Sequence, residues 1–126
     1  MTPVLVDTSV WVGHFRQANP ALATLLVQDR VLGHPMVVCE IACGTPPERA
    51  STLAHLRALQ PARQASTAEV LAFIERGQLF GLGCGWIDLL LLASTLINPG
   101  ATLWTTDKRL RRLAQRFGVL YQPGVH

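Results

Sequence analysis

Short continuous apolar runs along the chain are followed by segments whose apolar residues recur at helical spacing. This pattern predicts buried strands that are followed by helices. An apolar run of four residues ends at Asp7 and is typical of a buried parallel strand. Thr8 and Ser9 then offer hydroxyls that could cap a helix. For residues 1–44 we predict a strand at 3–6, helices at 8–15 and 20–28, a very short strand at 31–32, and a helix at 34–42 that begins near Pro35 and ends at Gly44.

The second half of the chain continues the same alternation. The segment Trp86–Ile97 is almost entirely apolar, so we expect this helix to be central. The other predicted elements are helices at 46–59, 67–80 and 108–117, a strand at 102–105, and a last strand at 119–121. Strands that alternate with helices indicate an α/β fold with a mainly parallel sheet, whose functional sites lie at the carboxyl ends of strands.

The length and composition fit one globular domain over residues 1–126. Hydrophobic residues make up 49% of the chain and charged residues 15%, which excludes a disordered composition. The amino-terminal segment has no basic region of the kind that opens a signal peptide. The apolar run Leu89–Ile97 is far shorter than the roughly 20 residues that a membrane span requires. We therefore expect a cytoplasmic protein without a membrane segment.

The three cysteines do not form a metal-binding pattern. Cys39 and Cys43 share one face of a predicted helix, and Cys84 stands alone. A zinc site would need four ligands, usually as close pairs. We interpret all three as small buried hydrophobic residues in a reducing compartment.

Four acids stand out by their positions. Asp7 closes a hydrophobic strand, Glu40 lies in an apolar helix, Asp88 precedes four leucines, and Asp107 follows a strand by two residues. A buried carboxylate is costly unless it is paired or holds a metal. If the four converge, their repulsion favours a divalent cation, and oxygen ligands alone suit Mg²⁺ or Mn²⁺. Such ions assist the cleavage of phosphodiesters.

The alternative interpretation is structural. Asp7, Asp88 and Asp107 each stand at the start of a predicted helix, where they could act as capping residues. Glu40, in the middle of a helix, has no such role.

The net charge of +3 becomes more positive outside these four acids, because 11 basic residues then face only four acidic ones. Such a surface attracts phosphate backbones. The arginines of the last predicted helix fit either a solvated face or a phosphate-binding surface; they are Arg109, Arg111, Arg112 and Arg116.

The segment Val4–Trp11, with sequence VLVDTSVW, resembles the opening of PIN domains. Glu40, Asp88 and the run Thr105–Asp107 complete the acidic order of that family, and the chain is most similar to the VapC toxins of VapBC toxin–antitoxin pairs. The resemblance implies a three-layer α/β/α fold with a short central sheet. It also implies hydrolysis of RNA, a homodimer, and a VapB-like antitoxin as partner.

The same resemblance implies roles for individual residues. Asp7 and Asp88 would be the principal ligands of Mg²⁺ or Mn²⁺, and Glu40 and Asp107 would complete the site directly or through waters. Two hydroxyl residues, Ser9 and Thr105, match positions that line such sites.

Two other function classes compete with a ribonuclease. A haloacid-dehalogenase-like phosphatase also begins with an aspartate at a strand end, but Ser9 stands where its second aspartate belongs, and Lys108 is the only lysine. A non-catalytic PIN-like binding module would not need the intact set of acids. The glycine-rich segment Gly81–Gly85 lacks the Gly-Lys-Ser/Thr ending of a nucleotide-binding loop.

Overall fold

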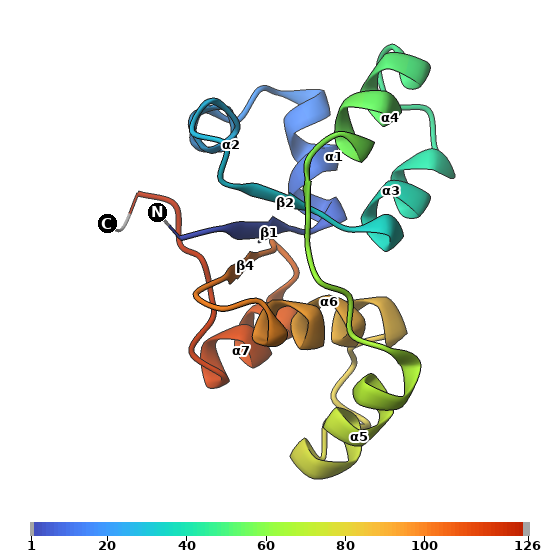
Figure 1. Cartoon of the computed structure of the whole chain (residues 1–126), viewed down its shortest axis with the longest axis vertical. Helices are drawn as coiled ribbons and strands as arrows, with labels where there is room; N and C mark the ends of the chain where they lie inside the picture. The colour runs from blue at the N-terminus through green and yellow to red at the C-terminus, as the bar shows by residue number, and fades with distance from the viewer. Residues whose placement is uncertain (1, 125–126) are drawn as a thin grey trace.

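The computed structural model describes residues 2–124, which form an α/β fold around a parallel sheet (Figure 1). Its elements are β1 (Val4–Val6), α1 (Thr8–Arg16), α2 (Pro20–Val27), β2 (Val31–Gly33), α3 (Pro35–Ala42), α4 (Arg49–Arg57), β3 (Gln60–Pro61), α5 (Thr67–Gly77), α6 (Trp86–Ile97), β4 (Thr102–Trp104) and α7 (Lys108–Arg116). The predicted fold class is therefore confirmed.

The four strands pair in the order β3-β2-β1-β4, and every pairing is parallel. Val4 pairs with Val31 of β2 on one side and with Thr102 of β4 on the other. The strand order thus reverses beside β1, because the chain first moves outward to β2 and β3 and then returns to β4. In parallel α/β sheets, ligands bind at such a reversal, outside the carboxyl ends of the strands.

The helices form a layer on each face of the sheet (Figure 1). The helices α1 to α4 cover one face, and α5 to α7 cover the other. This division follows from the right-handed crossover rule, since the two crossovers to β2 and β3 run in one direction and the crossover to β4 runs back. The predicted three-layer arrangement is confirmed.

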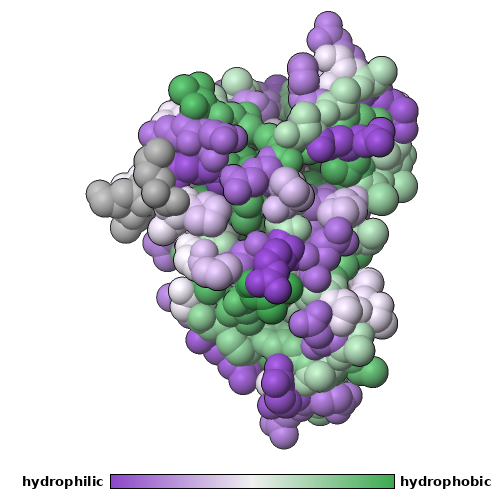
Figure 2. Space-filling model, viewed as in Figure 1, coloured by the Kyte–Doolittle hydropathy of each residue, from purple (hydrophilic) through white to green (hydrophobic). Residues whose placement is uncertain are grey.

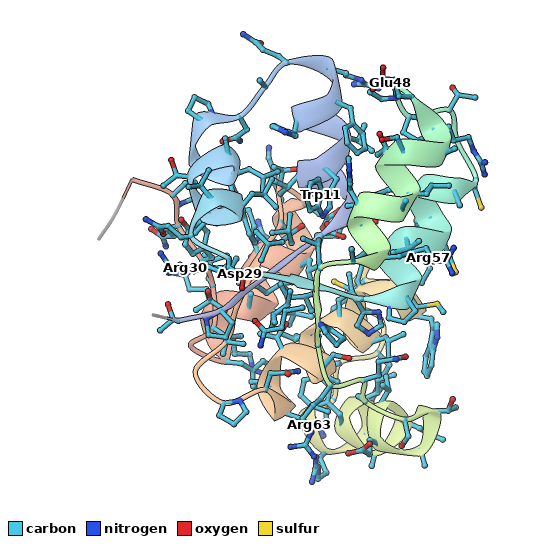
Figure 3. The ribbon with its side chains drawn as sticks, turned by 45° about the horizontal axis from the view of Figure 1, so that its top comes forward. Trp11, Asp29, Arg30, Glu48, Arg57 and Arg63 are labelled. Atoms are coloured by element: carbon cyan, nitrogen blue, oxygen red, sulfur yellow. The ribbon has the colours of Figure 1, made fainter. Side chains whose placement is uncertain are left out.

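The hydrophobic core lies between these layers and includes all of β1. Leu91 and Leu92 of α6 are fully buried, which confirms the predicted central position of that helix. Trp11 and Trp104 are also buried, and Trp11 lies between α1 and α4 (Figure 3). Trp86 differs, because 44% of its surface is exposed.

Several element boundaries differ from those predicted. The helix expected from Pro46 begins at Arg49, and α5 ends at Gly77 rather than Phe80. The strand β3 was not predicted, since only two residues pair there. The expected last strand reduces to a single bridge between Leu103 and Leu120. Each difference involves only one to three residues. Hydrophobic periodicity cannot locate an element boundary to within so few residues.

The prediction of buried cysteines is wrong for two of them. Cys39 and Cys43 are exposed, and Cys84 is partly buried. The helix α3 buries Val37 and Ile41, which lie four residues apart on its inner face, so the two cysteines lie on the outer side.

The surface combines polar and hydrophobic areas (Figure 2). Its exposed large hydrophobic side chains include Val27, Leu71 and Phe80. Among residues 2–124, no helix combines the length and hydropathy needed to cross a membrane.

Candidate active site

Asp7 lies at the carboxyl end of β1, next to the reversal in strand order. Its side chain is buried, and its Oδ1 accepts a hydrogen bond of 2.8 Å from the backbone N–H of Thr8. Asp7 is therefore the N-cap of α1, as the structural alternative predicted, and the hydroxyls of Thr8 and Ser9 bind other partners. The carboxylate is held at the place where the fold predicts a ligand.

Two hydroxyls hold the second oxygen of this carboxylate. Ser9 Oγ donates to Asp7 Oδ2 at 2.8 Å, and Thr105 Oγ1 donates to the same oxygen at 2.7 Å. Each hydroxyl also accepts a backbone N–H, Ser9 from Thr106 at 3.2 Å and Thr105 from Asp107 at 3.1 Å. The hydroxyls thus connect the carboxyl ends of β1 and β4 and fix the orientation of Asp7.

Glu40 reaches this region from α3. Its Oε1 accepts a hydrogen bond of 2.7 Å from the hydroxyl of Thr8. Glu40 is exposed, although its sequence neighbours are apolar, because it lies on the outer side of α3. Its position is therefore explained by this contact with Thr8 and not by burial.

Asp88 and Asp107 approach from the other helical layer. Asp88 stands in the first turn of α6, where its Oδ2 accepts the N–H of Gly85 at 3.2 Å. Asp107 is the N-cap of α7, and its Oδ1 accepts the N–H groups of Arg109 at 3.0 Å and Leu110 at 2.9 Å. The capping interpretation thus applies to Asp7, Asp88 and Asp107, and it coexists with their proximity.

The pKa of Asp88 is raised by burial and by the other three acids. Burial raises the pKa of Asp88 most, and the charges of Asp7, Asp107 and Glu40 raise it further, while the Gly85 N–H opposes them. The negative charges of the other three acids therefore all act on Asp88 at the carboxyl edge of the sheet. Repulsion of this kind is relieved by a bound cation.

Comparison with known proteins adds independent information. No protein-family model matches the chain. Ribonuclease VapC32 of Mycobacterium tuberculosis strain H37Rv is 40% identical over 116 residues, a match that covers 92% of this chain and 94% of that protein. The same protein from strain CDC 1551 / Oshkosh gives the same values.

The chain belongs to the VapC family of ribonucleases. This membership confirms the resemblance inferred from the VLVDTSVW segment and the order of the acids. The match spans nearly the full length of both proteins, so both helical layers of this VapC chain fall within the shared family fold.

The donor set in this VapC chain suits a hard cation. Four carboxylates and the hydroxyls of Ser9 and Thr105 present only oxygen atoms, which Mg²⁺ and Mn²⁺ prefer. Among residues 2–124, however, no group of three or more His, Cys, Asp or Glu side chains is placed so that it could hold a metal ion. The residues fit such a cation by the chemistry of their oxygen atoms and by the repulsion that Asp88 receives from the other three acids.

The sequence analysis missed Thr8 as an orienting residue for Glu40. The only sequence indication was its position inside the Asp-Thr-Ser motif, and hydroxyls beside an N-cap usually serve the helix itself. Two of the histidines have partners outside the acid cluster. His14 Nδ1 accepts the Asn19 N–H at 2.8 Å, and His34 is buried against Ser94.

Proposed function

We propose that this VapC chain is a toxin that hydrolyses RNA phosphodiester bonds with the help of Mg²⁺ or Mn²⁺. The observation that carries the proposal is that the charges of Asp7, Glu40 and Asp107 all act on Asp88, which comes from the opposite helical layer to Glu40. Membership of a ribonuclease family supports the same reaction.

Asp7 and Asp88 would be the principal metal ligands, and Glu40 and Asp107 would complete the site. When bound, the cation would supply an activated water for attack on phosphorus and stabilise the negative charge that develops on the phosphate. Asp7 can serve as a fixed ligand because three hydrogen bonds hold its carboxylate before any ligand arrives. Thr8 holds Glu40 in a similar way, with one hydrogen bond.

A direct assay tests this function. Purified protein is incubated with RNA and Mg²⁺ or Mn²⁺, with and without EDTA, and with a phosphatase substrate in a parallel reaction. We expect cleavage of RNA that EDTA abolishes and no release of phosphate from the second substrate. Phosphatase activity without RNA cleavage would contradict the proposal and favour the haloacid-dehalogenase-like alternative, whereas neither activity would favour a binding module.

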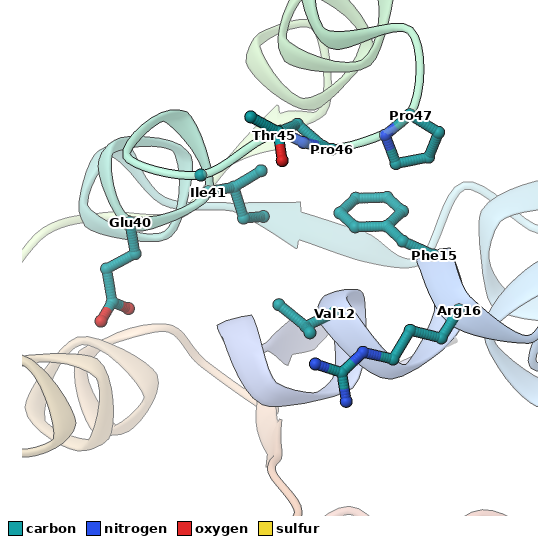
Figure 4. A pocket seen from close by; sticks show the side chains of 9 residues that line it. Val12, Phe15, Arg16, Glu40, Ile41, Thr45, Pro46 and Pro47 are labelled. Carbon is teal, nitrogen blue, oxygen red and sulfur yellow. The ribbon is translucent and has the colours of Figure 1, made fainter.

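A surface pocket beside Glu40 offers a place for an inhibitory partner (Figure 4). Its volume is about 450 Å³, and its apolar walls include Val12, Phe15 and Ile41. Glu40 and Arg16 lie on opposite sides of it (Figure 4). An apolar segment of a VapB-like antitoxin would lie in this pocket, and an arginine on that segment would pair with the acids, because its planar group binds carboxylates with two hydrogen bonds.

Co-expression with the product of the neighbouring upstream gene tests this partner. The product should co-purify with the chain, restore growth and suppress cleavage. Val12→Asp should weaken the complex, because it places a charge on an apolar wall, and it should leave RNA cleavage intact. Binding to wild type no tighter than that of an unrelated small protein would contradict the proposed partner.

We also propose a homodimer. Phe80, Leu82 and Trp86 follow one another within seven residues of the chain and remain 62%, 45% and 44% exposed, and exposed hydrophobic residues that are grouped are typical of an interface. Light scattering at tens of micromolar protein should give the mass of two chains. A monomer at that concentration would contradict this assembly.

A further inference from the structure

The loop between α5 and α6 makes close contact with an arginine of α7. An ideal Cβ atom on Gly83 would lie 2.6 Å from Cδ, 2.8 Å from Nε and 2.9 Å from Cζ of Arg109. Real Cβ atoms do not approach other atoms so closely, so the guanidinium of Arg109 occupies space that only a glycine leaves free. The backbone of Gly83, with φ of +85°, also favours glycine.

This contact lies between two of the site acids. The loop leads into α6, which carries Asp88, and Arg109 follows Asp107 by two residues. The neighbouring Cys84 responds to the same charges: burial raises its pKa most, Asp88 and Asp107 raise it further, and Arg109 opposes them. The positive charge of Arg109 is therefore located at the rim of the acid cluster.

The guanidinium of Arg109 has its donors free. In the part of the chain that the structure describes, four arginines donate to protein oxygens, and Arg109 is not among them; they are Arg30 to Thr2, Arg49 to Ala42, Arg111 to Thr105 and Arg116 to Gly77. Within residues 2–124, the side chain of Arg109 forms no hydrogen bond or salt bridge, and the residue is exposed. It thus packs against Gly83 while its N–H groups remain available.

We infer that Arg109 binds a phosphate of the RNA backbone at the rim of the acid cluster, and that Gly83 provides the space that positions it. This inference rests on the proposed ribonuclease function. The acids repel the substrate's phosphates, so a cation beside them is needed to bring the backbone close. Arginine suits the task because its planar fork matches two phosphate oxygens. A side chain already packed on the loop loses less entropy on binding.

The first test measures RNA binding independently of cleavage. Anisotropy of a fluorescein-labelled 20-nucleotide single-stranded RNA is recorded in EDTA at several salt concentrations. Arg109→Gln should weaken binding about tenfold. It should also reduce the slope of log affinity against log salt by about 0.7, the value for one phosphate contact with a single strand. Arg57→Gln removes the same charge from the far end of α4 and should leave the slope unchanged.

The second test uses a matched pair of glycines. Gly81 and Gly83 both have positive φ, +72° and +85°, but a Cβ on Gly81 would have no neighbour within 4 Å. Gly81→Ala therefore reports backbone strain alone, whereas Gly83→Ala also displaces the Arg109 side chain. Gly83→Ala should reduce RNA affinity and the salt slope as Arg109→Gln does, and Gly81→Ala should not. In an Arg109→Gln background, Gly83→Ala should cause no further loss.

The outcomes separate this inference from the proposed function. If wild type cleaves RNA but Arg109→Gln and Arg57→Gln have equal slopes, the assignment of Arg109 is overturned and the ribonuclease function stands. If Gly83→Ala and Gly81→Ala bind RNA equally well, the role of Gly83 is overturned. If wild type cleaves no RNA but Arg109→Gln still lowers the salt slope of RNA affinity, the phosphate contact stands and the proposed ribonuclease function is overturned. Thermal melting of each variant checks that the protein is folded under the conditions of the RNA-binding measurement.

Discussion

Asp7 and Asp88 have the same charge, but the protein holds them differently. Asp7 is fixed by two hydroxyls and one backbone N–H, so its carboxylate is well compensated. Asp88 receives a single N–H from Gly85 and is repelled by the other acids. One carboxylate therefore contributes to folding as well as to the proposed site, whereas the other costs stability in the absence of a cation.

Substitution by asparagine should separate these two roles. Asp7→Asn and Asp88→Asn should each abolish RNA cleavage. In EDTA, Asp7→Asn should lower the free energy of unfolding by about 1 kcal/mol, because an amide nitrogen cannot accept the hydrogen bonds that Ser9 and Thr105 donate to Oδ2. Asp88→Asn should leave it unchanged or raise it, because a repelled charge is removed. Urea unfolding measures both.

Asp29→Asn provides the control for these variants. Asp29 is exposed outside the site, with φ of +55°, a conformation that asparagine tolerates (Figure 3). It should leave cleavage and stability near wild type. Cleavage at the wild-type rate by either site variant would show that the acids are assigned wrongly.

Individual residues also show what the sequence could reveal about the site. The order of acids on a VLVDTSVW opening was sufficient to select Asp7, Glu40, Asp88 and Asp107 as candidates. The contacts of Thr8 with Glu40 and of Gly83 with Arg109 were not predictable, because each joins segments more than 25 residues apart through side-chain geometry. Hydrophobic periodicity carries no information about such contacts.

At the scale of elements, the starts of helices matter most for the site. Asp7, Asp88 and Asp107 stand at the N-termini of α1, α6 and α7, where the helix dipole stabilises negative charge. The almost entirely apolar α6 was predicted with its observed bounds, and α1, α2, α3 and α7 were predicted to within one residue. Short strands were not, since β3 consists of two exposed residues whose pairing depends on β2.

The helix that carries Glu40 is capped by a buried histidine. His34 Nδ1 accepts the Met36 N–H at 3.1 Å, which leaves the proton on Nε2, 3.2 Å from Ser94 Oγ. Ser94 Oγ also accepts the N–H of Ala65 at 3.1 Å. Protonation of Nδ1 would remove the cap of α3. This arrangement requires a neutral imidazole.

Stability should therefore depend on pH through His34. Burial lowers the pKa of His34 from its ordinary value of 6.5, so below pH 6.5 the unfolded chain binds a proton that the folded protein does not. The free energy of unfolding should fall as pH decreases below 6.5, by at most about 1.4 kcal/mol per pH unit for one proton. His34→Asn keeps a capping oxygen and should flatten this dependence in urea unfolding at several pH values.

The exposed His55 supplies the control, since His55→Asn should keep the wild-type dependence. Parallel curves for wild type and His34→Asn would show that His34 is not the group that titrates. The neutral imidazole would then have no consequence for the stability of the α3 helix.

For the whole molecule, the topology determines where the acids meet. The strand order reverses beside β1, so α1 and α3, which follow β1 and β2 in one layer, lie near α6 and α7 of the other layer at the carboxyl edge of the sheet. The sequence predicted the layers correctly, because alternating strands and helices leave few arrangements with right-handed crossovers. It did not give the strand order, which depends on pairings between segments up to about a hundred residues apart.

A cation in this site would join the two helical layers, and this leads to a prediction about global stability. Glu40 belongs to one layer and Asp88 to the other, so binding requires the folded sheet. At a Mn²⁺ concentration 100 times the dissociation constant, binding to the native state alone adds about 2.7 kcal/mol. For a domain of this size that corresponds to a rise of roughly 10 °C in the melting temperature.

Calorimetric melting with and without Mn²⁺ checks this prediction. The rise should disappear with EDTA and in Asp88→Asn, and it should persist in Asp29→Asn, which removes a charge outside the site. Removing Asp88 weakens the binding of the cation to one layer, whereas a general screening effect of Mn²⁺ on surface charges would not distinguish the two variants. An equal rise in both variants would place the cation elsewhere, and the four acids would then require another explanation for their proximity.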